Sequence, residues 1–265
     1  MPSPATRLYT LVFPLRVWAA CLLFALPAAL CVIAIPGRKR RRRWARRAAR
    51  ILFRLAGIPL KVVGLEHLPT SACFLASNHA TYLDGPLLTA ALPPRFGFVI
   101  KREAMKTPLI GWLLVRLGSE FVERFDTKTA LSDATRLIQL ARDGVSLGVF
   151  PEGTFKPEPG LRAFHLGAFL AATRAGIPVV PVVIRGARDI LPGETLWPRP
   201  GRVEVELLAP IMPAGKHGDD ARALRDAVHA NILAHCSKLE RVHAMPQHGS
   251  ATDAGRKEKP PFNAA

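Results

Sequence analysis

The sequence predicts an α/β fold in which a mostly parallel sheet is flanked by helices, with one membrane helix at the N-terminus. Past residue 50, short apolar runs alternate with helical patterns, and this alternation is typical of a parallel sheet covered on both faces. Before it, residues 17–35 carry no charge, and a helix of this length reaches about 28 Å, close to the hydrocarbon thickness of a bilayer. The 265 residues, 49% of them hydrophobic, suffice for one or two domains with a buried core.

The first fifty residues predict a membrane anchor with a basic juxtamembrane segment. Residues 38–50 hold nine positive charges directly after the apolar run, in which Pro27 is an expected kink. A cleaved signal peptide does not fit, because basic residues just after a cleavage site resist export. The positive-inside rule then places everything after Ile35 on the cytoplasmic side of the plasma or inner membrane. Arg7 and Arg16 disfavour a full span, so a helix or helical hairpin sunk into one leaflet is the alternative.

The rest of the chain predicts a globular domain over residues 51–241 and a disordered tail over residues 242–265, which are rich in His, Gly, Lys and Pro. Short apolar runs predict strands at 60–65, 73–77, 96–100, 120–122, 145–150, 178–184 and 203–208. Helical spacing of apolar residues predicts helices at 85–91, 103–117, 127–143, 161–175 and 219–239. The clearest of these is 127–143, which Gly144 terminates.

The composition favours an anionic partner. Lys and Arg number 37 against 20 Asp and Glu, a net charge of +17, so the surface should attract anionic membrane lipids, phosphorylated substrates or nucleic acid. A membrane-tethered nucleic-acid binder is the alternative from a different class, but no nucleic-acid module follows the basic run. The four cysteines are far apart, which excludes a disulfide scaffold, and a metal hydrolase is disfavoured because the eight histidines show no ligand spacing.

Residues 78–84, N-H-A-T-Y-L-D, follow a short apolar strand and contain the first candidate for chemistry. Histidine acts as a general base near neutral pH, and a carboxylate that accepts its second N–H raises its basicity. In one continuous helix His79 and Asp84 would point about 140° apart. They can meet only if His79 lies in a turn and Asp84 opens the next helix, which the following Gly85-Pro86 favours. The alternative is that Asp84 caps a helix with His79 nearby.

Three further stretches stand at expected strand ends, where parallel sheets bind ligands. Glu152 in the turn at 150–154 could accept hydrogen bonds from a polyol, and Arg124 could grip a phosphate with both guanidinium nitrogens. Residues 177–184 read as a buried strand with structural prolines. By contrast, residues 144–148 match the G-x-S-x-G string of serine hydrolases, but a helix precedes Ser146 and a strand follows it, which reverses the required order.

Together and in this order, four blocks resemble the glycerolipid acyltransferase family, typified by 1-acyl-sn-glycerol-3-phosphate acyltransferase. The family blocks read N-H-x-x-x-x-D, G-x-x-F-[IV]-x-R, F-x-E-G-T-R and V-P-V-x-[IL]. Here they stand at residues 78–84, 118–124, 150–155 and 180–184, and the resemblance covers about residues 58–210. The family's N-terminal membrane element also agrees with the anchor expected above.

The resemblance implies that His79, oriented by Asp84, activates the hydroxyl of a lysophospholipid acceptor toward an acyl-CoA or acyl carrier protein thioester. It implies no metal, no cofactor and no nucleic-acid partner. Contacts to the acceptor or its phosphate are then expected from Arg124, Glu152, Gly153, Thr154 and Lys156. Structural support in the blocks is expected from Asn78, Gly118, Phe121, Pro151 and Pro181.

The third block departs from the family pattern. Its final residue is usually Arg, which in the family helps to hold the acceptor's phosphate, whereas this chain has Phe155 followed by Lys156. Lysine is a point charge and cannot copy a guanidinium fork. The resemblance therefore favours 1-acyl-sn-glycerol-3-phosphate as acceptor, with phosphatidic acid as product, and leaves another lysolipid as the alternative.

Overall fold

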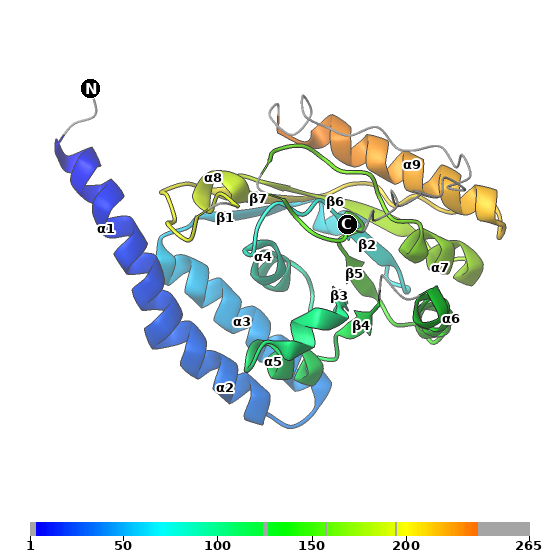
Figure 1. The fold of residues 1–265 in the computed structure, drawn as a ribbon, viewed down its shortest axis with the longest axis horizontal. Coiled ribbons are helices and arrows are strands. Elements are labelled where there is room, and N and C mark those ends of the chain that lie inside the picture. The colour runs from blue at the N-terminus through cyan, green and yellow to red at the C-terminus, as the bar shows by residue number, and fades with distance from the viewer. Residues whose placement is uncertain (1–3, 124–126, 157, 194, 238–265) are drawn as a thin grey trace, which may run out of the picture.

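The computed structural model describes residues 4–123, 127–156, 158–193 and 195–237. A seven-stranded sheet in the order β1-β7-β6-β2-β5-β3-β4 lies at its centre (Figure 1). Its strands are β1 (Leu60–Val63), β2 (Phe74–Ser77), β3 (Gly97–Lys101), β4 (Glu120–Val122), β5 (Leu147–Val149), β6 (Val179–Arg185) and β7 (Val203–Leu207). Every neighbouring pair is parallel except β6 with β7. The seven expected strands and the mostly parallel sheet are confirmed.

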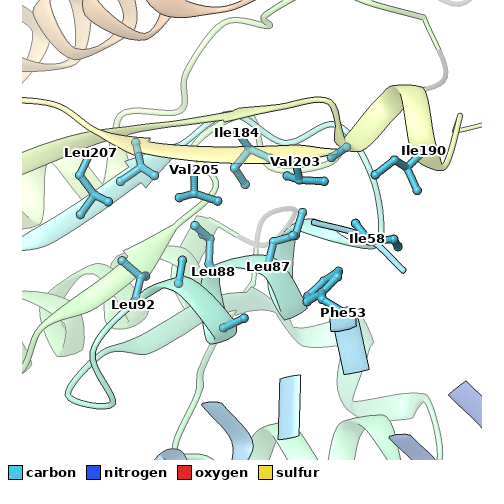
Figure 2. Close-up of a cluster of buried hydrophobic side chains, with 14 of the residues drawn as sticks. Phe53, Ile58, Leu87, Leu88, Leu92, Ile184, Ile190, Val203, Val205 and Leu207 are labelled. Carbon is cyan, nitrogen blue, oxygen red and sulfur yellow. The ribbon is translucent and has the colours of Figure 1, made fainter. Parts of the chain in front are cut away.

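Helices cover both faces of this sheet. They include α4 (Asp84–Ala91), α6 (Thr127–Arg142), α7 (Gly167–Ala175) and α9 (Gly218–His235), with the short α5 (Ile110–Arg116) and α8 (Ala187–Ile190). Strand β6 shows the two-sided burial, since alternate side chains of a strand point to opposite faces. Val182 and Ile184 join the apolar cluster under α4, whereas Val179 and Val183 join the cluster built with α6, α7 and α9. Figure 2 shows the side chains of α4 facing those of β6 and β7.

Two expected helices differ from the structure. The pattern at 103–117 splits into a 3₁₀ turn, η3 (Arg102–Lys106), and α5, because Pro108 offers no N–H and disfavours a helical residue before it. The helix expected at 161–175 begins only at Gly167. The preceding backbone is used elsewhere, since the N–H of Arg162 donates to Glu152 and that of His165 to the carbonyl of Pro151.

The N-terminal residues form a helical hairpin. Helix α1 (Pro4–Ala20) continues through a π-helical turn, η1 (Cys21–Ala25), into α2 (Leu26–Ala34), and α3 (Arg38–Ala56) returns beside it (Figure 1). The π turn stands just before Pro27, where a proline ring would clash with a normal helical carbonyl. The stretch Tyr9–Ala34 contains an 18-residue window with a mean hydropathy of 2.5 and is long and apolar enough to cross a membrane. Arg16 in this helix donates to the carbonyl of Leu55 at the end of α3.

The basic run of α3 divides into an inner and an outer face. The inner arginines donate to main-chain carbonyls at and just after the C-terminal ends of other helices: Arg41 to Arg116, Arg42 to Leu117 and Gly118, Arg46 to Ala91, and Arg50 to Ala90. Such carbonyls lack partners within their own helix and carry the negative end of its dipole. Burial lowers the pKa of Arg42 to about 10, so it stays charged at neutral pH. Residue 50, where the membrane segment was expected to end, thus lies inside α3, which is bonded to helices of the globular part.

Candidate active site

His79 and Asp84 meet in the geometry that the sequence required. Strand β2 ends at Ser77, His79 lies in the turn that follows, and Asp84 is the first residue of α4. His79 Nδ1 lies 2.8 Å from Asp84 Oδ2. Because the carboxylate holds Nδ1–H, the other ring nitrogen, Nε2, is left to take a proton.

The Asp84 carboxylate also closes the turn that carries His79. It is fully buried, and its Oδ2 accepts the backbone N–H groups of Ala80 at 2.6 Å and Thr81 at 2.9 Å. Its other oxygen, Oδ1, accepts the Thr81 hydroxyl at 3.3 Å. The alternative in which Asp84 caps a helix is not what the structure has, since Leu83 is the N-cap residue and no side chain caps α4.

Aromatic rings fix the plane of the His79 imidazole. It stacks on Phe150, with ring centroids 4.2 Å apart and an angle of 21° between the planes. The edge of Phe155 approaches it from another side at 5.0 Å, and the same ring meets Tyr82 at 4.6 Å. The sequence identified Phe155 only as a departure from a block, and it gave no signal that this side chain would contact the candidate base.

Glu152 links three segments around His79. It follows β5, which pairs in parallel with β2, so both strands deliver their next residues to the same edge of the sheet. Its Oε1 accepts the backbone N–H of His79 at 2.6 Å, and Oε2 accepts that of Arg162 at 3.0 Å. The side chain is buried. The carboxylate expected to receive a polyol thus already accepts two main-chain donors, and Gly153 turns the chain behind it with a φ of +84°.

The supporting residues of the blocks lie where they can hold the site together. The Asn78 side chain exchanges two hydrogen bonds with the main chain of Ile184, at 3.0 and 2.8 Å, which joins the ends of β2 and β6. Pro181 lies within β6 opposite Ala76. Gly118 follows α5 with a φ of +71°, and an added Cβ there would lie 2.5 Å from the Arg38 side chain.

The remaining candidates are peripheral. Pro151 is buried, Phe121 is half-buried on β4, and Thr154 and Lys156 are exposed. Arg124 lies outside the described residues. Ser146 precedes β5 and its hydroxyl accepts the backbone N–H of Cys73 at 3.4 Å, so the rejection of a hydrolase elbow is confirmed.

Comparisons with known proteins agree with this geometry. The family described as "Acyltransferase" matches residues 59–185. The 1-acyl-sn-glycerol-3-phosphate acyltransferase alpha of Bos taurus is 30% identical over 234 residues, which cover 87% of this chain and 80% of the relative. The chain belongs to the 1-acyl-sn-glycerol-3-phosphate acyltransferase family. The resemblance read from the four blocks is confirmed.

Two further comparisons bear on fold and acceptor. The chain shares its fold with the 1-acyl-sn-glycerophosphate acyltransferase of Thermotoga maritima, with a TM-score of 0.68, 20% identity and coverage of 87% and 97% of the two chains. It is also 33% identical over 216 residues to the lyso-ornithine lipid O-acyltransferase of Pseudomonas aeruginosa, covering 75% and 80% of the two chains. The chain spans only 38% and 64% of the lengths of the matching Brassica napus and Mus musculus enzymes.

Proposed function

We propose that this acyltransferase moves a fatty acyl group from a thioester donor to the free hydroxyl of a lysophospholipid. His79 Nε2 takes the hydroxyl proton as the oxygen attacks the thioester carbonyl, the new C–O bond forms, and the C–S bond breaks. The imidazolium then returns the proton to the departing thiolate of CoA or of acyl carrier protein. The observation that carries this proposal is the 2.8 Å contact between His79 Nδ1 and the buried Asp84 carboxylate.

We take 1-acyl-sn-glycerol-3-phosphate as the acceptor and phosphatidic acid as the product. The name of the bovine relative and the net charge of +17 support this assignment. Arg124 and Lys156 are the cations we assign to the acceptor's phosphate, with Gly153 and Thr154 shaping the turn beside it. Glu152 acts through the His79 backbone, which it holds at 2.6 Å.

A second acceptor class, a lysolipid without a phosphate monoester, is favoured by one observation. Where the family pattern has a phosphate-binding arginine, this chain places the ring of Phe155 between His79 and Tyr82. A similar protein from Pseudomonas aeruginosa is named for lyso-ornithine lipid. A ring at this position would pack against an apolar or zwitterionic part of the acceptor.

The acceptor brings the reaction to a membrane, and the N-terminal hairpin supports that location. Its apolar stretch Tyr9–Ala34 would bury itself in lipid. The outer face of α3 presents the exposed Arg40, Arg43 and Arg47 with Trp44, which would meet anionic headgroups. We assign the catalytic domain to the cytoplasmic side of the plasma or inner membrane, where the basic run would remain.

The test is to incubate the purified full-length protein with labelled acyl-CoA or acyl carrier protein and a panel of lysolipids, and to identify the product. If lysophosphatidate is the acceptor, Arg124→Ala raises the KM for lysophosphatidate much more than it raises the KM for the thioester, and Phe155→Arg leaves the use of lysophosphatidate unchanged or improved. If the acceptor lacks a phosphate monoester, Phe155→Arg impairs turnover and Arg124→Ala does little. Arg142→Ala on the exposed side of α6 is the control for a lost charge. Failure to acylate any lysolipid would refute the proposal.

A further inference from the structure

A small pocket lies directly beside the candidate base. It is lined mainly by Tyr82, Phe155, Leu191, Pro192 and Leu196, and its volume is about 280 Å³. This is close to the lower end of small-molecule sites, which span about 300–1,000 Å³. Phe155 forms a wall that the pocket shares with His79, since its ring lies 5.0 Å from the imidazole and 4.6 Å from Tyr82. Only the ring of Phe155 would separate a ligand in this pocket from the candidate base, His79.

One lining residue of the pocket, Leu196, is bonded to the apolar N-terminal helix. The indole N–H of Trp18 in α1 donates to the carbonyl of Leu196 at 3.2 Å. Leu196 is 62% exposed and the neighbouring Trp197 is 53% exposed, so two large apolar side chains stand uncovered beside α1. In Figure 1 the loop after α8 lies next to α1.

The outer face of the same helix is also apolar. Leu11 and Leu15 are more than 60% exposed, as are Leu22 and Leu23 in the π turn that continues α1. Exposed apolar side chains that rim a pocket mark a contact with lipid or another partner. Leu196 therefore contacts α1 and lines the pocket, and Phe155 joins the same pocket to the candidate base.

We infer that this pocket holds the alkyl chain of the acceptor lysolipid, which enters it sideways from the membrane. The inference rests on the proposed function and adds a binding site to it. The acceptor is the substrate that a bilayer holds, and its reactive hydroxyl lies a few bonds from its alkyl chain. The thioester donor arrives from water on a carrier, whereas the pocket residue Leu196 is bonded to α1. The two classes of acceptor share this chain, so the site is independent of the headgroup.

The test compares two acceptors that share a headgroup and differ in alkyl length, six against sixteen carbons, with one saturating acyl-CoA and the full-length protein. Leu191→Trp fills the pocket and should lower kcat/KM for the sixteen-carbon acceptor by about tenfold or more. The same variant should leave the six-carbon acceptor within about twofold, because that chain does not need the space. Leu65→Trp, which adds the same ring at an exposed position just after β1, is the control and should change neither value.

Leu196→Asn is a second variant in case the indole disturbs folding. It alters an exposed side chain and keeps the carbonyl that binds Trp18. It should again lower kcat/KM only for the sixteen-carbon acceptor. Equal losses for both acceptors, or no loss for either, would overturn the inference while acyl transfer itself stands. If the loss of kcat/KM in the variants instead depends on the alkyl length of the acyl donor at a fixed acceptor, the pocket belongs to the donor, and the inference is also overturned. Failure of the wild-type protein to acylate any lysolipid, from acyl-CoA or from acyl carrier protein, would instead refute the proposed function.

Discussion

Replacing Asp84 with asparagine should lower kcat by about 10²–10⁴ and leave the acceptor KM within about twofold. The amide is the same size, and its oxygen can still accept the backbone N–H groups of Ala80 and Thr81 that Oδ2 binds at 2.6 and 2.9 Å. The same oxygen position contacts His79 Nδ1 at 2.8 Å, so the amide oxygen there still accepts Nδ1–H, and the NH₂ group faces the Thr81 hydroxyl in place of Oδ1. The negative charge that stabilises the imidazolium during proton transfer is lost, so Nε2 becomes a weaker base.

The stability cost of the same change can be worked from these bonds. Two backbone hydrogen bonds go from a charged to a neutral acceptor, which costs about 1 kcal/mol each. For a chain of this size, about 2 kcal/mol lowers Tm by about 4–8 °C, so the variant stays folded at 25 °C. The assay is thiol release from acyl-CoA with the acceptor varied, beside thermal unfolding. Asp143→Asn, at an exposed carboxylate that accepts from Gln139, is the matched control. A fully active Asp84→Asn would refute the orienting role and leave Asp84 only the closing of the turn.

Three other changes test separate parts of the account. Glu152→Gln replaces one of the two carboxylate oxygens that accept backbone N–H groups, and it should lower kcat about 10- to 100-fold with the acceptor KM within about threefold. A raised acceptor KM at unchanged kcat would instead mean that Glu152 binds the acceptor. Replacing Arg40, Arg43 and Arg47 together by alanine should weaken flotation with anionic vesicles about 100-fold at low salt, since each contributes about 1 kcal/mol; an equal loss on neutral vesicles would contradict this. Burial lowers the pKa of His229, so the stability that its neutral form gives is present above about pH 6.5 and is lost as pH falls. His229→Gln should flatten the fall in Tm between pH 7.5 and 5.5, and an unchanged slope would exclude this residue as its source.

Most of the sheet could be predicted because its strands are short apolar runs between helical patterns. Strand β6 is buried on both faces, so its run of valines and isoleucine left no other interpretation. The helix at 161–175 was predicted six residues too long, because the sequence does not show that Glu152 recruits the N–H of Arg162. A long-range hydrogen bond of this kind overrides local helical spacing.

The candidate base and its carboxylate could be predicted because local chain chemistry fixes them. Gly85-Pro86 set the start of a helix, and that start brings Asp84 onto His79 at 2.8 Å. The role of Glu152 could not be predicted. A glutamate in a turn looks the same in the sequence whether its carboxylate oxygens face a substrate or main-chain N–H groups.

The sequence analysis did not predict that the basic run of α3 divides into an inner and an outer face, although part of the pattern is visible in the sequence. Arg42, Arg46 and Arg50 recur every four residues and so share one helical face. The sequence alone does not show that the C-terminal ends of α4 and α5 bring their carbonyls to that face. Side-chain partners from distant elements appear only once the helices pack.

Acyl transfer by His79→Ala is the most direct test of the central claim, that the His79 imidazole activates the acceptor hydroxyl. Thiol release from acyl-CoA should fall by about 10²–10⁴ at saturating acceptor. Because His79 is a partly exposed side chain in a turn that Asp84 and Glu152 still close through backbone N–H groups, Tm and vesicle binding should stay near wild type. Turnover within a few-fold of wild type in a folded His79→Ala protein would contradict the mechanism.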